Sequence, residues 1–350
     1  MLPNVREILK PDLPAVAEFL SRQVRAGEAV SDAALTPEQR LRWLLLDCPQ
    51  RPPEIPLGWL IRRHDGAVVG AAVCVPFQIG VGEHIWPALM FAKFFVDPPY
   101  RGMGLGILMR FIRLGVRYPL FVTSTNAVAG QLFQKLGATQ INGMDHTMLG
   151  IARAKPLAEE WLHRRTHNAM LARLLSLPAI ALPGKLRFAQ APTSSLQPIT
   201  SPDDAFLTQV PPTTATISFV HDPAYIRWRY FSGDPDKEVY RFRVDSEQDR
   251  LVVVNRVKAG YRGQIRVVNV LDVWPPTTQS SAPALAAALT RQYQGTFDAI
   301  WLRSQPPSAE EALEWARFVR HDFPAPLGWF IDREKRLPTE PWYLMPGESE

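Results

Sequence analysis

Three residues near position 100 have the types and the spacing of a phosphate-binding loop. In VDPPYRGMGLG, residues 96–106, Arg101 is followed by Gly104 and Gly106, and the loop joins an apolar run to a helical one. The first turn of a helix carries unpaired N–H groups, and its dipole favours negative charge. Glycine at alternate positions leaves room for a phosphate to approach the backbone. The pattern Arg-x-x-Gly-x-Gly therefore predicts an anion site where a strand enters a helix.

Two other phosphate-binding patterns do not match this loop. A Walker loop ends in Gly-Lys-Ser/Thr, and residues 104–109, GLGILM, contain neither lysine nor a hydroxyl group. A dinucleotide loop has the spacing G-x-G-x-x-G after the first strand of a βαβ unit. Here the loop reads G-x-G-x-G and follows three apolar runs that are separated by hairpin signals. A tight turn that binds nothing is the alternative left open.

Together with the helical segment NAVAGQLFQKLG at 126–137, the loop resembles the GCN5-related N-acetyltransferase (GNAT) superfamily, over residues 1 to about 150. The resemblance implies that the loop amides hold the pyrophosphate of an acyl-CoA, most simply acetyl-CoA. It also implies that the preceding strand hydrogen-bonds the pantetheine arm through its main chain, in a V-shaped gap beside residues 119–125. The residues implied to contact the cofactor are Phe94, Phe95, Val96, Arg101, Gly102, Met103, Gly104, Leu105, Gly106, Asn126 and Phe133.

The resemblance implies direct acyl transfer to an amine in a ternary complex, which requires a base for the amine and an acid for the leaving thiolate. Two positions that often carry these groups in the superfamily are occupied here by Phe133 and Met90, which cannot transfer protons. By strand alternation, Lys93 should face away from Met90. Cys74 reads as a core residue. Candidates that also fit ordinary surface or loop positions are Glu83, His84, Ser124, Asp145 and His146. An ordered water is another route for the proton.

The elements that must position these residues follow from periodicity. The first 140 residues predict the order β-α-α-β-β-β-α-β-α, and residues from 238 onward predict β-β-β-α-β-α, which repeats the order from 58 to 137. We therefore expect an α/β (α+β) fold in which a GNAT-like unit occurs twice. Each unit should have a mixed, mostly antiparallel sheet that is flanked by helices and splayed between its fourth and fifth strands. The second phosphate loop is replaced by WPPTTQSSAPA (274–284), which lacks glycine and contains prolines without N–H groups.

We accordingly expect three segments: an acyl-CoA-binding domain at 1–152, a helix and Pro-rich linker at 153–200, and a degenerate GNAT-like domain at 201–350. Residues 156–177 predict one helix with a basic middle. Its apolar part, which extends over residues 170–183, is too short to span a bilayer. Both a helix packed between the domains and an interfacial membrane helix fit it, and we favour the first. Trp228, Arg229 and Tyr230 are candidates for an acceptor pocket, although an aromatic-rich helix also fits a core.

Composition narrows the class of protein. The 350 residues suffice for two domains, and the formal charge of +5 is spread along the chain, which does not favour nucleic-acid binding. No apolar run is long enough to span a membrane, residues 1–14 lack a signal-peptide layout, and neither the two cysteines nor the histidines have metal-site spacing. We expect a cytoplasmic N-acyltransferase without a metal, acting on a small amine such as an amino sugar of polysaccharide or cell-envelope biosynthesis. A non-catalytic acyl-CoA-binding or scaffold protein is the rival.

Overall fold

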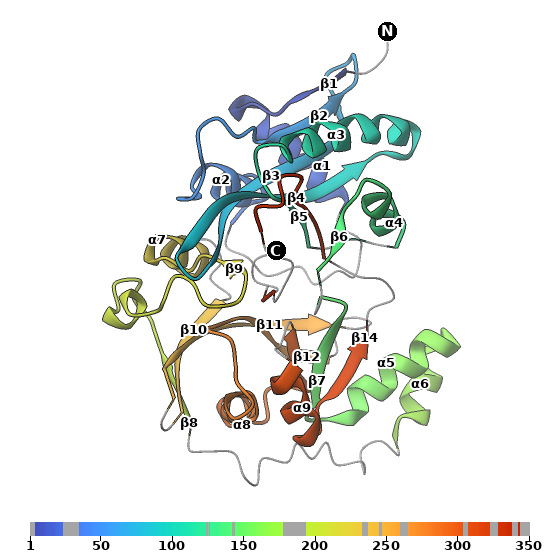
Figure 1. The fold of residues 1–350 in the computed structure, drawn as a ribbon. Helices are drawn as coiled ribbons and strands as arrows, with labels where there is room; N and C mark the ends of the chain where they lie inside the picture. Colours follow the sequence, from blue (N-terminus) through green and yellow to red (C-terminus); the bar gives the residue numbers. More distant parts are fainter. Residues whose placement is uncertain are drawn as a thin grey trace.

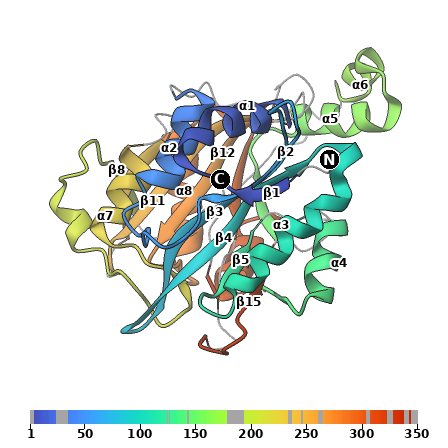
Figure 2. The same ribbon diagram turned by 90° about the horizontal axis from the view of Figure 1, so that it is seen from above.

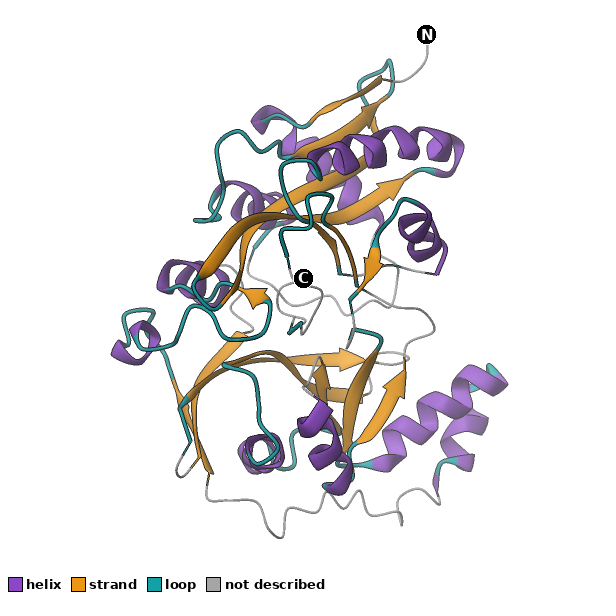
Figure 3. Cartoon of the chain, in the orientation of Figure 1, coloured by secondary structure: helices purple, strands orange, loops and turns teal. Residues whose placement is uncertain are grey.

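Two β-sheets, each flanked by helices, form the protein in the computed structural model (Figure 1). Figure 3 shows their strands as two separate layers. The mixed, mostly antiparallel sheets confirm the expected fold class. The structure describes residues 4–23, 35–123, 125, 127–141, 144–177, 194–232, 237–244, 247–259, 265–303, 307–322, 328–337 and 342–343.

The first part of the chain follows the predicted order of elements. They are β1 (Asn4–Glu7), α1 (Leu13–Gln23), α2 (Pro37–Leu46), β2 (Gly58–Arg62), β3 (Val68–Val81), β4 (His84–Val96), α3 (Arg101–Leu114), β5 (Leu120–Val122), α4 (Ala127–Lys135) and β6 (Thr139–Gln140). A capping box fixes the start of α2, because the Thr36 hydroxyl accepts from the Gln39 N–H and the Gln39 side chain accepts from the Thr36 N–H. Gly82, at φ +56°, provides the left-handed turn between β3 and β4.

The rest of the chain supplies most of the second sheet. Its elements are β7 (His146–Ile151), α5 (Ala154–Thr166), α6 (Ala169–Leu175), β8 (Ser194–Pro198), β9 (Ser218–Phe219), α7 (Pro223–Ile226), a π-helical turn (Arg227–Phe231), β10 (Lys237–Val244), β11 (Arg250–Ala259), β12 (Ile265–Trp274), α8 (Ser281–Gln292), β13 (Ala299–Arg303), α9 (Pro307–Trp315), β14 (Val319–Asp322) and β15 (Trp329–Ile331). From β10 to α9 the order is the predicted β-β-β-α-β-α.

Each sheet takes an inner strand from the other half of the sequence, and the first sheet also takes the short strand β9. The first has the order β1-β2-β3-β4-β5-β15-β6, with β9 paired to β3, and the second has the order β14-β7-β13-β12-β11-β10-β8. β15 lies antiparallel between β5 and β6, and β7 lies antiparallel between β13 and β14. Each half of the sequence therefore completes the sheet of the other half.

Helices cover both faces of the first sheet (Figure 2). The face beside α1 and α2 packs Val75, Phe77 and Met90 with residues of both helices. The face beside α3 packs Phe91 and Phe111, whose rings stack with centroids 4.5 Å apart. Successive β4 residues thus enter different cores, as strand alternation requires.

The expected single helix at 156–177 is wrong. The segment forms α5 and α6, which are separated at His167 by a left-handed residue with φ 51°. The expectation that it packs between the two domains is also wrong. Leu157 of α5 packs against Ile265, Val267 and Ala299 of the second sheet, and α5 and α6 project from the edge of the molecule (Figures 1 and 2).

Candidate functional site

The first sheet opens between β4 and β5. The two strands run parallel and are in register only at Leu89 with Leu120 and Met90 with Phe121, while the Leu89 N–H donates to the Pro119 carbonyl at 3.0 Å. β4 continues to Val96, still paired on its other side with β3. The β5 side of β4 after Met90 therefore borders a gap, as expected for the splay.

A β-bulge lies at the mouth of this gap. Ala71 pairs with Phe95 and Val73 with Ala92, so two β4 residues face one β3 residue. Lys93, at the bulge, has φ 51°, a conformation that residues with a side chain rarely adopt. The expectation that Lys93 faces away from Met90 is wrong, because the extra residue shifts the alternation and both side chains line the same pocket.

Beyond β4, the short 3₁₀ turn Pro98–Tyr100 leads into α3 at Arg101. No side chain caps this helix, and its first turn contains no acidic residue. A Cβ on Gly102 would meet nothing within 4 Å, whereas a Cβ on Gly104 would lie 3.2 Å from the Phe94 ring and 3.3 Å from Val96. Gly104 thus lets α3 pack on β4, and Gly102 leaves open space at the helix N-terminus.

Several large apolar side chains are exposed around the gap. They come from the end of β4 and from α3 and α4, the three elements beside it. Leaving such surface in water is unfavourable, and a cluster of it is typical of a ligand site. The residues are Phe94, Phe95, Leu105, Met109, Val128 and Leu132.

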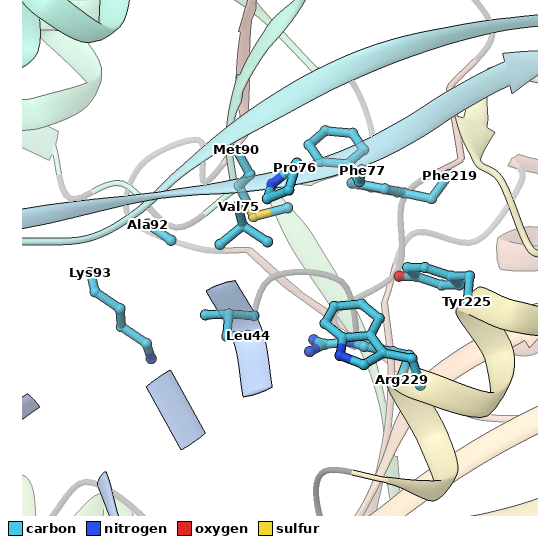
Figure 4. A pocket seen from close by; sticks show the side chains of 11 residues that line it. Leu44, Val75, Pro76, Phe77, Met90, Ala92, Lys93, Phe219, Tyr225 and Arg229 are labelled. Atoms are coloured by element: carbon cyan, nitrogen blue, oxygen red, sulfur yellow. The ribbon is translucent and has the colours of Figure 1, made fainter. Parts of the chain in front are cut away.

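A pocket lies on the α1/α2 face of the sheet, beside the bulge (Figure 4). Its walls come from β3, β4, α2, β9, α7 and the π-helical turn. In Figure 4, Met90 and Lys93 extend from β4 toward Leu44, and Tyr225 and Arg229 face them from the opposite side. The lining residues are Leu44, Val75, Pro76, Phe77, Met90, Ala92, Lys93, Phe219, Tyr225, Trp228 and Arg229.

The pocket is narrow, and Trp228, one of a stacked pair of tryptophans, forms part of its wall. The volume open to the centre of a water molecule is about 20 Å³, room for about one water. Trp228 stacks on Trp43 at a centroid distance of 5.0 Å, and each indole N–H donates to the carbonyl of the other, at 3.2 and 3.3 Å. Of the three residues singled out in the sequence, Trp228 and Arg229 line the pocket, whereas the Tyr230 hydroxyl donates to buried Asp272.

The structure separates the proposed catalytic residues from this pocket. Glu83 is in the β3–β4 turn and His84 begins β4, nine residues or about 30 Å from Lys93 along the strand. His146 begins β7, in the second sheet. Its Nδ1 contacts Asp145 and its Nε2 contacts Glu310, both at 2.8 Å. Hydrogen bonding to Glu310 raises the pKa of His146.

Other sequence candidates lie in the core or outside the described residues. Phe133 of α4 is buried against Phe91, with an edge-to-face ring distance of 6.5 Å. Cys74 is fully buried on β3, and burial raises the pKa of its thiol, so it carries no thiolate near neutral pH. Ser124 and Asn126 lie outside the residues that the structure describes.

The matching strand-to-helix junction in the second half is closed by its own side chains. Where β12 leads to α8, the Ser281 side chain accepts from the Thr278 N–H at 2.7 Å, and the hydroxyls of Thr278 and Ser280 donate to Glu247. Burial opposes ionisation of Glu247, but hydrogen bonds from Ser280 and Arg250 lower its pKa. A carboxylate thus occupies the region where the first half leaves a helix N-terminus open.

Deeper in the second half, a hydrogen-bonded group fills the end of β12. His221 Nε2 lies 2.7 Å from Asp272, the Tyr230 hydroxyl donates to the same carboxylate, and the His221 ring stacks on Trp274 at 4.2 Å. These residues are buried. The structure offers no counterpart there of the open space at Gly102.

Comparison with known proteins identifies the architecture. No family model and no curated protein matches the sequence. A probable N-acyltransferase from Enterococcus faecalis V583, a conserved protein of unknown function, matches at TM-score 0.54 and 9% identity, over 94% of this chain and 72% of that one. A GCN5-related N-acetyltransferase from Anabaena variabilis ATCC 29413 matches at TM-score 0.54 and 10% identity, over 95% and 73%. Eis1 from Mycobacterium abscessus matches at TM-score 0.52 and 15% identity, over 94% and 73%. The chain therefore has the fold of the GCN5-related N-acetyltransferases.

Proposed function

We propose that the protein is an acyl-CoA-dependent N-acyltransferase that uses acetyl-CoA and a small amine. The observation that supports this most directly is the path along β4. The gap between β4 and β5 reaches the uncapped N-terminus of α3 at one end and the pocket beside Lys93 at the other. A donor with a phosphate end and a reactive end would fit this path.

The residues present fit an acyl-CoA. Amides of the first turn of α3, with Arg101, would bind the pyrophosphate, and the open space at Gly102 admits it. Main-chain groups of Phe94, Phe95 and Val96 would hydrogen-bond the pantetheine arm. The exposed apolar side chains beside the gap would cover it. Bound acyl-CoA supplies the activated thioester.

The contribution of the chain to transfer would be mainly positional. The pocket would hold the amine beside the bulge, and such approximation supplies much of an enzymatic acceleration. Among the described pocket residues, Lys93, Tyr225 and Arg229 can ionise. Met90 and Phe133 cannot carry protons, which favours a water-mediated proton transfer.

The pocket chemistry also suits the proposed acceptor class. The pocket has room for about one water, so it would take the amino group, and the rest of the acceptor would lie at its opening, where Lys93 suits an anionic group. An amino sugar, free or linked to a nucleotide, would carry such an amino group. Because acetyl-CoA is the donor, a cytoplasmic location fits this activity.

We further propose residues 1–152 as the acyl-CoA-binding domain, 153–200 as helix and linker, and 201–350 as a degenerate unit that does not bind CoA. The Glu247 carboxylate, which accepts hydrogen bonds from Thr278 and Ser280 just before α8, and the buried His221–Asp272 pair support the last assignment. The second half would instead contribute Phe219, Tyr225, Trp228 and Arg229 to the acceptor pocket.

Thermal-shift titration with acetyl-CoA, followed by thiol-release assays on a panel of amines that includes amino sugars, tests the proposal. We expect a rise in melting temperature with acetyl-CoA and release of CoA with at least one amine. Absence of a shift would refute both the transferase and its rival. A shift without release for any amine would favour a non-catalytic acyl-CoA-binding protein, the function that Phe133 and Met90 favour.

A further inference from the structure

The α5–α6 unit, residues 154–177, carries a concentration of exposed apolar side chains. One of them is Trp161 of α5, four belong to α6, and one lies two positions after the end of α6. Elsewhere, apart from the borders of the gap at β4, large exposed apolar side chains are scattered singly among the described residues. The residues are Trp161, Met170, Leu171, Leu174, Leu175 and Leu177, with exposed fractions of 42–75%.

The orientation of α6 is opposite to that of an ordinary surface helix. At 100° per residue, Met170, Leu171, Leu174 and Leu175 form one face, and this face is exposed. The buried residues on its other side are small: Ala172, and Ser176 directly after the helix. A surface helix usually buries its large apolar residues and exposes its polar ones. The leucine face of α6 is therefore a surface that needs a partner.

The charge of the unit indicates the chemistry of that partner. Residues 154–177 contain Lys155 and three exposed arginines, Arg164, Arg165 and Arg173, against two glutamates. One glutamate, Glu160, is buried and pairs with Arg164 at 2.7 Å. The guanidinium of Arg165 lies 4.0 Å from the centre of the Trp161 ring. Leucines with a tryptophan, bordered by arginines, are typical of helices that lie in the interface of a membrane.

The size of the surface favours a membrane over a second protein. A helix of seven residues is about 10 Å long. Its apolar face is thus several times smaller than the ~800 Å² per partner of a stable protein interface. Binding at a lipid interface needs only a small apolar area reinforced by positive charge. No helix among the described residues is long and apolar enough to cross a membrane.

We propose that the α5–α6 unit docks the protein on an anionic lipid surface, with the leucines of α6 at the acyl boundary and Arg164, Arg165 and Arg173 at the headgroups. The unit projects from the second sheet, away from α3 and the gap at β4 (Figures 1 and 2). Docking would thus leave the proposed acyl-CoA site open. The proposal is independent of the acyltransferase assignment.

Co-sedimentation of the full chain with vesicles tests the proposal. We expect binding to equal mixtures of phosphatidylcholine and phosphatidylglycerol, little binding to phosphatidylcholine alone, and loss of binding at high salt. Leu174→Ser/Leu175→Ser should abolish the binding. Arg165→Gln/Arg173→Gln should weaken it about fivefold per charge, from ~1 kcal/mol for each basic residue near an anionic surface.

A matched control removes exposed apolar side chains elsewhere. Leu9→Ser/Val116→Ser, at positions 58% and 54% exposed, should leave vesicle binding unchanged. If circular dichroism shows that the leucine variant is unfolded, the result for the arginine variant decides the test. Equal binding to neutral vesicles, or binding that survives both the leucine and the arginine variant, would overturn the proposal. So would sedimentation equilibrium showing a dimer that Leu174→Ser/Leu175→Ser dissociates, because a second copy would then be the partner.

Discussion

Trp329 of β15 pairs with Val122 of β5, across the border between the two halves of the sequence. The Trp329 indole also donates to the Thr125 hydroxyl at 3.1 Å and packs under Gly130 of α4, where an added Cβ would lie 3.2 Å from the ring. One residue from the second half thus contacts both β5, which borders the β4–β5 gap, and α4, the next helix along the chain. The proposed acyl-CoA site depends on residues far outside its motif.

Trp329→Ala should lower the free energy of unfolding by about 3–5 kcal/mol, the usual cost of removing a buried tryptophan. Urea denaturation measures this loss. Amide hydrogen exchange should show reduced protection at residues 120–122, because β15, which pairs with β5, loses the side chain that packs it in place. Trp161→Ala, at an exposed position, is the control and should stay within about 1 kcal/mol of the wild type, because it removes only the cation–π contact with Arg165. Unchanged protection of β5 would show that β15 does not stabilise this part of the sheet.

Gly102→Glu and Gly102→Gln separate charge from size at the proposed pyrophosphate site. Both side chains enter open space, so both variants should fold. The carboxylate should weaken acetyl-CoA binding more than tenfold relative to the amide, equivalent to ~1.4 kcal/mol. In the free protein it should stabilise α3 by about 0.3–1 kcal/mol through the helix dipole. Titration calorimetry and thermal melts measure the two opposite effects, and equal affinity of the two variants would contradict the site.

Lys93→Gly tests whether the strained backbone of Lys93 lowers stability while its side chain contributes to acceptor binding. Glycine adopts φ 51° without the penalty of about 1–2 kcal/mol that a side chain incurs there. The variant should therefore be as stable as the wild type or up to about 1 kcal/mol more stable, while the KM for an anionic amine rises. Lys93→Ala is the matched variant, since it removes the ammonium and keeps the strain. If neither variant changes the KM, Lys93 does not contact the acceptor.

Titration of His146 should make the stability of the protein depend on pH, independently of catalysis. Its ring nitrogens face Glu310 and Asp145, with the Arg320 guanidinium 3.7–3.8 Å from both carboxylates. Hydrogen bonding to Glu310 raises the folded-state pKa of His146 above 6.5. Its contribution is therefore complete below about pH 6.5, the unfolded-state value, and disappears as the pH rises through the folded-state value.

Urea denaturation between pH 5 and 9 should reveal this contribution. We expect the wild type to lose more stability than His146→Gln as the pH increases, by at most about 1.4 kcal/mol per pH unit. His84→Gln, at an exposed position, should follow the wild type. Parallel curves for the wild type and His146→Gln would show that the histidine is not held protonated between the two carboxylates.

Local signals were sufficient to predict most elements and the phosphate loop. β2, β3 and β4 pair with neighbours along the chain, so alternation and turn residues such as Gly66 and Gly82 define them. The loop from Arg101 to Gly106 could be predicted because its chemistry lies within one helical turn. For the same reason, the prolines and the missing glycines at 274–284 sufficed to predict that no phosphate loop precedes α8, whereas the Glu247 carboxylate there comes from a distant loop and could not be predicted.

Long-range pairing and backbone irregularities could not be predicted. The three residues of β15 match many sheet edges, so nothing in their sequence specifies β5 as a partner. Lys93 was assigned to the wrong face because one extra residue in β4 reverses every later side chain. The pocket combines residues as distant as Leu44 and Tyr225, which only the folded chain brings together. For α6 the sequence left a packed helix and an interfacial helix open, and the packed helix was favoured wrongly, because periodicity shows that a helix has an apolar side but not which side is covered.

The exchange of β7 and β15 has a consequence for synthesis. A ribosome releases the Arg101–Gly106 loop early, yet β5 gains its neighbour only after residue 331 has left the exit tunnel. While residues 123–328 are being synthesised, the edge of β5 that later pairs with β15 stays unpaired. We expect chaperones to bind this exposed edge during that time. The protein should therefore acquire affinity for the proposed acyl donor only when synthesis is nearly complete, and two separately expressed halves should bind that donor only when they are combined.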